Sequence, residues 1–198
     1  RFPEALPTVK TAYCWGCDAP GPHRISLPSG QAAYACKACG QHFERSYIWD
    51  PAMVQSFDAH GDLLHDGAGV FITDGQGNVL LFQRTKFPFL LTIPAGHRDT
   101  GEDPLTCALR ETLEETGISL KPADVQLVFD APIYGDSCVG GADIHHWHAY
   151  QAVVDPTTVQ AEIDADEGSD WQWHPIDSLN EENTTFPVVY MIEQANLL

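Results

Sequence analysis

Residues 96–118 constrain this chain more than any other stretch, because they predict both a helix and a site on that helix. Asp103 followed by Pro104 is typical of a helix start, since aspartate accepts hydrogen bonds from free backbone amides and proline fits the first turn. Gly117 is typical of a helix end, because glycine readily adopts the left-handed conformation that stops a helix. The segment therefore predicts a helix over residues 104–116.

The predicted helix has an apolar side and an acidic side when its residues are placed at about 100° intervals. The apolar side comprises Leu105, Leu109, Thr112 and Leu113, and the acidic side comprises Glu111, Glu114 and Glu115. We expect the leucines to face the core and the three glutamates to face a shared exterior site.

The clustered glutamates disfavour an ordinary solvated surface. A solvated helix usually places Lys or Arg four residues from an acid, whereas Glu111 and Glu115 form a like-charged pair at that spacing. Acids near the C-terminal end also oppose the helix dipole, and only Arg110 offsets them. Hard divalent cations bind where several carboxylate oxygens converge, so the pattern predicts a divalent-metal site.

The same stretch matches a known sequence pattern. Gly96, Glu102 and the run from Arg110 to Ile118 fill G-x5-E-x7-R-E-U-x-E-E-x-G-U, the Nudix box, in which U is a bulky aliphatic residue. The one departure is Thr112, where an aliphatic residue is usual. The chain thus resembles the Nudix hydrolase family. The resemblance implies an α/β/α sandwich with a mixed sheet over residues 66–198, and metal-dependent hydrolysis of a nucleoside diphosphate linked to another group.

The resemblance also implies roles for individual residues. The Mg²⁺ or Mn²⁺ ligands would be Glu111, Glu114, Glu115 and the carbonyl oxygen of Gly96. Arg110 would orient a glutamate, either Glu111 or Glu102, and Glu102 would support the loop or a metal-bound water. Metal ions would bridge an anionic enzyme and an anionic substrate, polarise phosphoryl oxygens and lower the pKa of the attacking water.

The general base stays open between two glutamates, because Nudix enzymes differ at this step. Glu111 is one candidate, and Glu167 in the late acidic loop DADEGSDW is the other. Glu167 could equally be an ordinary acidic loop residue. Cys107 lies one turn before Glu111, and we expect a small half-buried side chain there, not a reactive thiol.

Four of the six cysteines form the spacing C-x2-C-x18-C-x2-C, which lies within the range of a four-thiolate zinc site. The predicted Zn²⁺ ligands are Cys14, Cys17, Cys36 and Cys39. Such a shell is closed, so the zinc would be structural, and His23 and His42 are expected on the surface. Two disulfides are the alternative. The predicted organisation is a zinc ribbon at residues 1–50, a connector at 51–65 and a Nudix domain at 66–198.

Alternating apolar runs predict the strands of the second domain. Residues 67–73 and 79–84 flank the turn DGQGN, and further strands are expected near 89–94, 125–134, 145–154 and 170–176. A short helix is expected near Asp177 and a final helix over about 186–197.

The net charge of −18 argues against long nucleic acid as a partner, since phosphate binding requires clustered Lys and Arg. A small nucleotide remains compatible if metal ions supply the positive charge. The chain has no apolar run of membrane-spanning length and no signal-like start, and reduced thiolates favour the cytoplasm. The ribbon is expected either to support the catalytic domain or to form a homodimer contact.

The substrate is less constrained by the sequence. A zinc ribbon before a Nudix domain resembles the NAD(H) diphosphatases, but their S-Q-P-W-P-F-P signature is absent. Tyr134 stands where dinucleoside polyphosphate hydrolases tend to have a tyrosine, and Pro132 stands near the proline of ADP-ribose diphosphatases. Candidate residues for stacking on a base are Tyr134, Trp147 and Phe87.

Two alternatives remain open at this point. His146 and His148 would share one face of a strand, which is a weak signal for a metal site because no acid lies beside them in sequence. A non-catalytic Nudix-like nucleotide sensor is the alternative function, although such domains usually lose the glutamates that this chain retains.

Overall fold

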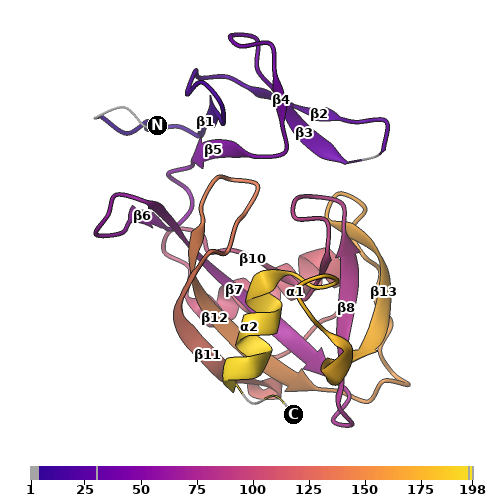
Figure 1. The fold of residues 1–198 in the computed structure, drawn as a ribbon. Helices are drawn as coiled ribbons and strands as arrows, with labels where there is room; N and C mark the ends of the chain where they lie inside the picture. Colours follow the sequence, from indigo (N-terminus) through magenta and orange to yellow (C-terminus); the bar gives the residue numbers. More distant parts are fainter. Residues whose placement is uncertain (1–4, 30, 196, 198) are drawn as a thin grey trace.

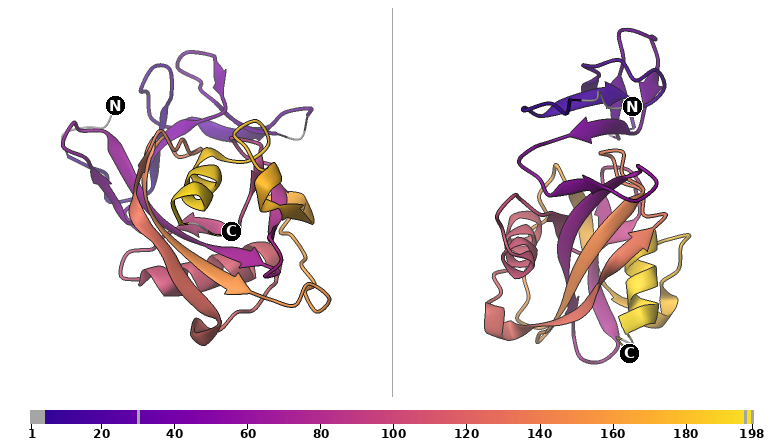
Figure 2. Two further views of the ribbon diagram at one scale, coloured as in Figure 1. Left: turned by 60° about the horizontal axis from the view of Figure 1, so that its bottom comes forward. Right: turned by 90° about the vertical axis from the view of Figure 1, so that its left-hand side faces the viewer.

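The computed structural model describes residues 5–29, 31–195 and 197. A small ribbon lies above a larger body, in which one mixed sheet is covered by a helix on each face (Figure 1 and Figure 2). Parts of the predicted domain ranges lie outside the described residues, namely positions 1–4 and 30 of the ribbon and positions 196 and 198 at the end. Within the described residues, no helix is long and apolar enough to cross a membrane.

The ribbon contains two small antiparallel sheets. In the first, β1 (Thr11–Cys14) pairs with β5 (Ser46–Trp49). The second sheet has the order β2 (His23–Ser26), β3 (Ala32–Ala35), β4 (His42–Phe43). Apart from two cysteines, the buried apolar residues of the ribbon are three alanines of β3 and two tyrosines. A core this small contributes little stability by itself.

The larger sheet has the strand order β11-β12-β7-β8-β13. These strands are β7 (Leu63–Thr73), β8 (Asn78–Arg84), β11 (Val125–Tyr134), β12 (Ile144–Val153) and β13 (Gly168–Pro175). Three short strands extend it: β6 (Gln55–Phe57), β9 (Leu91–Thr92) and β10 (Ala95–His97). The β12–β7 pairing is parallel and the other described pairings are antiparallel, so the sheet is mixed as predicted.

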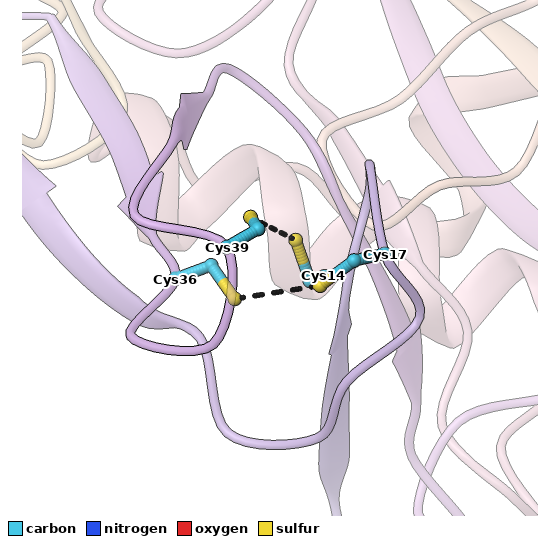
Figure 3. A group of neighbouring side chains, drawn as sticks. All are labelled: Cys14, Cys17, Cys36 and Cys39. Atoms are coloured by element: carbon cyan, nitrogen blue, oxygen red, sulfur yellow. Dashed lines mark hydrogen bonds between the residues drawn. The ribbon is translucent and has the colours of Figure 1, made fainter.

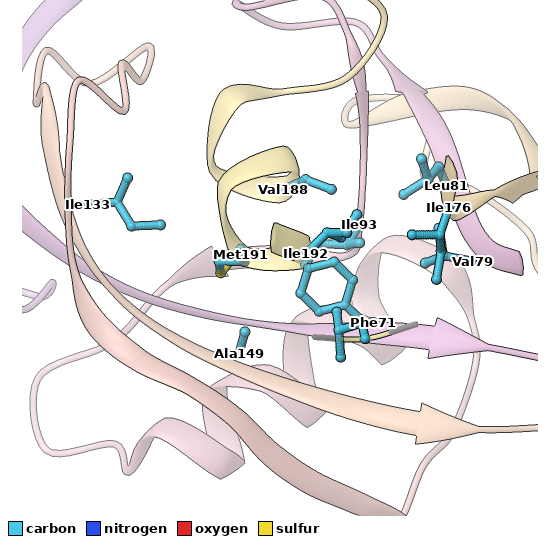
Figure 4. Packing of buried hydrophobic residues seen from close by; sticks show 11 residues of the cluster. Phe71, Val79, Leu81, Ile93, Ile133, Ala149, Ile176, Val188, Met191 and Ile192 are labelled. Carbon is cyan, nitrogen blue, oxygen red and sulfur yellow. The ribbon is translucent and has the colours of Figure 1, made fainter. Parts of the chain in front are cut away.

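Strand alternation divides the core into two layers. On one face, Phe71 of β7 packs with Val188 and Met191 of α2 (Phe186–Ala195), as Figure 4 shows. On the other face, Val70 of β7 packs against α1 (Pro104–Thr116). The two helices therefore lie on opposite faces of the sheet, which confirms the predicted α/β/α sandwich (Figure 2). Two short 3₁₀ helices, Pro122–Asp124 and Ile176–Ser178, complete the fold.

Helix α1 begins and ends where the sequence predicts. The Asp103 carboxylate accepts from the Thr106 amide at 3.1 Å, and Gly117 has φ of 69° with its amide donating to the Leu113 carbonyl.

The predicted orientation of α1 is right for Thr112, which is buried, and wrong for the leucines. Leu113 is 50% exposed, whereas the fully buried positions of the helix are Cys107, Ala108, Thr112, Glu115 and Thr116. Small side chains let α1 lie close to the sheet, where Cys107 and Ala108 share a cluster with Ala68 of β7. The glutamates at 111 and 115 consequently point between the helix and the sheet, and the leucines lie at its margin or outside.

Candidate active site

A cavity of about 390 Å³ opens beside α1, β10 and the loop after β8. It also reaches the 136–139 loop, the late acidic loop and the base of the ribbon. The structure brings most of the predicted site residues to this one cavity. Those that line it are Gly96, Arg110, Glu111, Glu115, Glu167, Phe87 and Trp147.

Glu111 lies directly against β10. A Cβ atom at Gly96 would be 2.1 Å from the carboxyl carbon of Glu111, so only glycine leaves room for this carboxylate. Burial raises the pKa of Glu111 above its ordinary value, and the neighbouring Arg110 partly opposes that shift. A half-desolvated carboxylate next to the Gly96 backbone is suited to bind a cation.

Glu115 is the most enclosed acid of the site, with 5% of its surface exposed. Its Oε2 accepts a hydrogen bond from the Ala95 amide at 2.8 Å. Burial raises the pKa of Glu115 to about 8, and the nearby negative charges of Glu111 and Glu167 add to the effect. A buried carboxylate with two further acids beside it in one cavity forms a site that a divalent cation would stabilise.

Arg110 contacts both of the glutamates that it was expected to orient. It donates to both carboxylate oxygens of Glu102 at 2.9 Å and to Glu111 at 2.6 Å. Glu102 also accepts from the Asp99 amide at 3.1 Å, which agrees with the predicted support of the loop. Glu114 accepts from Arg110 at 3.1 Å, but its side chain is 59% exposed and lies at the rim.

Three basic residues of the cavity were not predicted from the sequence, namely Lys10 near the ribbon and the two residues described next, Arg84 and Lys86. Lys86 forms an ion pair with Glu167 across the cavity wall. Arg84 lines the same cavity, and its Nε is a buried nitrogen without a hydrogen-bond partner in the described part of the chain. Arg84 is the last residue of β8 and Lys86 follows two residues later. Basic residues at the end of a strand that precedes the box are therefore the sequence signal that could have indicated them. They give the cavity a local positive charge that an anionic substrate could use.

The three candidate stacking residues have different positions. Phe87 and Trp147 line the cavity, and the indole nitrogen of Trp147 donates to Asp136 at 2.6 Å. Tyr134 is 62% exposed and lines a different hollow, near Phe57 and Leu63. Strand alternation is the reason, because it buries Ile133 in the core and turns Tyr134 away from it. The structure therefore does not bring Tyr134 to the glutamates.

His146 and His148 have acidic neighbours that sequence proximity could not reveal. Asp130 of the adjacent strand β11 lies 2.7 Å from His146 and 3.3 Å from His148. Asp66 of β7 lies 3.4 Å from His148 on the other side. Asp130, His146 and His148 each place one ligand atom within 4.8 Å of the others, and the group is partly exposed.

The four ribbon cysteines converge as predicted (Figure 3). All are free, which is at odds with the disulfide alternative. The sulfur–sulfur distances are 3.7 Å for Cys14–Cys39 and 3.8 Å for Cys17–Cys36. Four thiolates about 2.3 Å from a tetrahedral zinc are about 3.8 Å apart, so the group fits the ion. His23 and His42 are exposed, as expected.

Cys107 is fully buried, more so than predicted. Burial raises the pKa of its thiol to about 12, and the charges of Glu102 and Glu111 add to the shift. The protonated thiol is a poor nucleophile, so Cys107 is a packing residue.

Gly96→Ala tests whether the close fit of the Glu111 carboxylate against Gly96 matters for activity. The new methyl group would displace the Glu111 carboxylate, because the space is already filled by its carboxyl carbon. A displacement of about 1 Å can cost about 10²-fold in rate, so we expect kcat to fall by that order while the fold persists. Steady-state kinetics and far-UV circular dichroism measure the two. Gly77→Ala, in the β7–β8 turn away from the cavity, controls for a loss of stability alone, because its φ of 91° strains alanine there; its kcat should stay near the wild-type value. Unimpaired kinetics in Gly96→Ala would contradict the close fit of Glu111 against Gly96.

Comparison with known proteins agrees with this geometry. Residues 63–194 match the NUDIX domain family model. An RNA pyrophosphohydrolase of Agrobacterium fabrum is 32% identical over 139 residues, covering 58% of this chain and 79% of that protein.

Two solved structures share the fold. One is a C. elegans Ap4A hydrolase binary complex, with a TM-score of 0.51 and 19% identity over 66% of this chain and 93% of that one. The other is the NUDIX domain of Shewanella oneidensis NrtR with ADP ribose, with a TM-score of 0.53 and 23% identity over 71% and 92%. The box, its helix between β10 and the sheet, and the family match over residues 63–194 together establish that this chain belongs to the Nudix family.

Proposed function

We propose that this protein is a divalent-metal-dependent pyrophosphohydrolase acting on a small nucleotide, a nucleoside diphosphate linked to another group. The observation that carries the proposal is the placement of Glu111 and Glu115, two desolvated acids with raised pKa values, beside the Gly96 backbone in one cavity. Similarity to an RNA pyrophosphohydrolase supports hydrolysis of a phosphoanhydride bond.

The residues that would hold Mg²⁺ or Mn²⁺ are Glu111, Glu115 and the Gly96 carbonyl, with Glu114 contributing from the rim. Such an ion polarises phosphoryl oxygens and lowers the pKa of a bound water. Arg110 holds Glu111 in place and neutralises part of the acidic charge before the ion binds. Arg84 and Lys86 would bind substrate phosphate oxygens, and Arg84 has a free buried donor for that purpose.

We propose Glu167 as the general base, because Glu111 would be occupied by the metal ion. Its position in the cavity wall, held by Lys86, supports this role. Loss of a general base typically costs about 10²–10⁴-fold, so Glu167→Gln should lower kcat by that order while metal affinity stays close to that of the wild type. Isothermal titration with Mn²⁺ and steady-state kinetics separate the two quantities. An unchanged kcat would transfer the role to Glu111.

The cavity suits a small nucleotide. Its volume of about 390 Å³ lies in the range of ligand pockets, and Phe87 and Trp147 offer faces for a base. The solved neighbours include an Ap4A hydrolase complex and a domain bound to ADP ribose, which supports testing these two classes first. The net charge of −18 disfavours long RNA.

A substrate panel tests the proposal. Phosphate-containing products are measured with Mg²⁺ or Mn²⁺ for ADP-ribose, NADH, diadenosine polyphosphates, nucleotide sugars, nucleoside triphosphates and a short 5′-triphosphate RNA. One preferred substrate, lost in Glu115→Gln, would support the enzyme. If folded and zinc-loaded protein releases no product from any substrate of the panel, the non-catalytic sensor alternative is favoured.

We also propose that the four ribbon cysteines hold a structural zinc ion. The converged sulfurs and their distances support this. The cytoplasmic location and the homodimer contact stay predictions.

A further inference from the structure

A second group of imidazole and thiol ligands lies beside the cavity, and three of its four members line it. It comprises His65 of β7, His97 of β10, Cys138 of the loop between β11 and β12, and His145 of β12. One ligand atom from each lies within 4.8 Å of the other three. His65 and His145 are buried. None of the four is a ribbon cysteine or occupies a fixed position of the box, although His97 directly follows Gly96.

The distances within this group match a tetrahedral zinc shell. His65 Nδ1 lies 3.1 Å from His97 Nε2, and His97 Nε2 lies 3.4 Å from His145 Nε2. The Cys138 sulfur lies 3.6 Å from His65 Nδ1. Zinc bonds of about 2.0–2.1 Å to nitrogen and 2.3 Å to sulfur predict nitrogen pairs about 3.4 Å apart and nitrogen–sulfur pairs about 3.6 Å apart.

The surroundings orient one of these ligands for binding. His145 Nδ1 lies 3.1 Å from the Asp136 carboxylate, which is itself held by the indole of Trp147 at 2.6 Å. A carboxylate that accepts the Nδ1 proton leaves the Nε2 lone pair of His145 directed into the group, as in many zinc sites. Gly140 adds room, because a Cβ atom there would lie 3.1 Å from the His65 ring.

His65 is the ligand whose proton must move. Gln55 Nε2 lies 2.7 Å from His65 Nε2 and donates to it, which places the proton of the neutral ring on Nδ1. An ion bound at Nδ1 displaces that proton, and the Gln55 amide must then turn so that its oxygen accepts from Nε2. This turn gives up two bonds to the backbone, from the Asp50 amide to Gln55 Oε1 at 2.7 Å and from Gln55 Nε2 to the Ile48 carbonyl at 3.1 Å. Proton release on binding is the ordinary behaviour of His and Cys ligands.

We propose that His65, His97, Cys138 and His145 bind a zinc ion, separate from the ribbon zinc and from the catalytic metal. Imidazole and thiolate ligands favour zinc over Mg²⁺ or Mn²⁺, which prefer oxygen. Four protein ligands close the shell, so this ion would be structural and would not take part in the hydrolysis. A chain of pairwise hydrogen bonds is the competing explanation, but it does not require all four ligand atoms to converge on one point.

The ion would fix the loop between β11 and β12, which contacts the ribbon. Arg45 of the ribbon donates to the Cys138 carbonyl at 2.8 Å, and the amides of Ser46 and Ile48 donate to the Val139 and Gly140 carbonyls. Cys138 and Val139 also line the cavity. Zinc at this position would tie the loop to β7 and β10 and hold one wall of the substrate cavity.

The test is the zinc content of the full-length protein after dialysis against metal-free buffer, measured by mass spectrometry of the metal. Cys138→Ser and His145→Asn are each expected to hold one zinc equivalent fewer per chain than the wild type. His60→Asn is the control, since it removes an exposed histidine that lies in none of the three groups of converging ligands, and it should keep the wild-type content. Folding of each variant is checked by near-UV circular dichroism.

Cobalt substitution provides an independent reading. Co²⁺ bound by one thiolate and three imidazoles has visible bands distinct from those of a four-thiolate site, and Cys138→Ser should remove only the former. Wild-type zinc content in both folded variants, or a cobalt spectrum unchanged by Cys138→Ser, would overturn the proposal. These measurements need no substrate, so they stand or fall independently of the pyrophosphohydrolase activity.

Discussion

Replacing Glu115 with glutamine is expected to abolish turnover and, at the same time, to stabilise the metal-free protein. Glu115 would be a metal ligand in the cavity, and a Lewis-acid metal contributes several kcal/mol to the transition state. About 4 kcal/mol corresponds to roughly 10³-fold in rate, so we expect kcat/KM to fall by at least that order. Glutamine retains a carbonyl oxygen that can accept the Ala95 amide, so the local fold should persist.

The stabilisation follows from the pKa of Glu115, which burial raises from 4.5 to about 8. Between these values the folded protein keeps a proton that the unfolded chain has released. Stability is therefore lost as pH rises from about 4.5 to 8, and glutamine removes this loss. Each tenfold change in protonation corresponds to about 1.4 kcal/mol, so a rise of the pKa from 4.5 to about 8 makes the gain at pH 8 on the order of 5 kcal/mol.

Thermal unfolding in chelator-free, Mg²⁺-free and Mn²⁺-free buffer at pH 5 and pH 8 measures the effect. The Tm of Glu115→Gln should exceed that of the wild type at pH 8, with a much smaller difference at pH 5. Glu193→Gln, an exposed change of the same type on α2, should leave both activity and Tm unaltered. A variant that loses activity because it is less stable would point to a structural role instead.

Cys36→Ser is expected to unfold the ribbon while the Nudix sheet stays folded. The ribbon has few buried apolar side chains of its own, whereas the larger sheet has a packed core on each face. Apparent zinc-binding free energies of about 10–16 kcal/mol at four-ligand sites are folding free energies for such small units. Loss of one thiolate should therefore remove the ribbon zinc and most of the ribbon's stability.

Hydrogen exchange followed by mass spectrometry distinguishes the two parts. Amides of β1 to β5 should lose protection in Cys36→Ser, and those of β7, β8 and β12 should keep it. His42→Ser, an exposed change in the same ribbon, should behave like the wild type. Retained protection of β1 to β5 in Cys36→Ser would show that the ribbon does not depend on its metal.

Several features were predictable because they depend on neighbours along the chain. The limits of α1 follow from Asp103 and Gly117, and the strands follow from alternation in runs such as residues 125–134. The four-cysteine group follows from the spacing of its two pairs, since each pair forms one tight turn. The contacts of Arg110 with Glu102 and Glu111 were also predictable, because these residues lie close together along the chain.

The tertiary structure decided which way each element faces and what meets across the sheet. A helical wheel separates leucines from glutamates but cannot say that small residues and acids will face the sheet, because close packing against β7 selects them. Strand alternation at the end of β11 turned Tyr134 away from the cavity. Lys86 meets Glu167, and His65 meets Cys138, over separations of 81 and 73 residues. Sequence spacing specifies contacts within one turn or one strand pair, whereas such distant pairs exist only once the sheet has assembled.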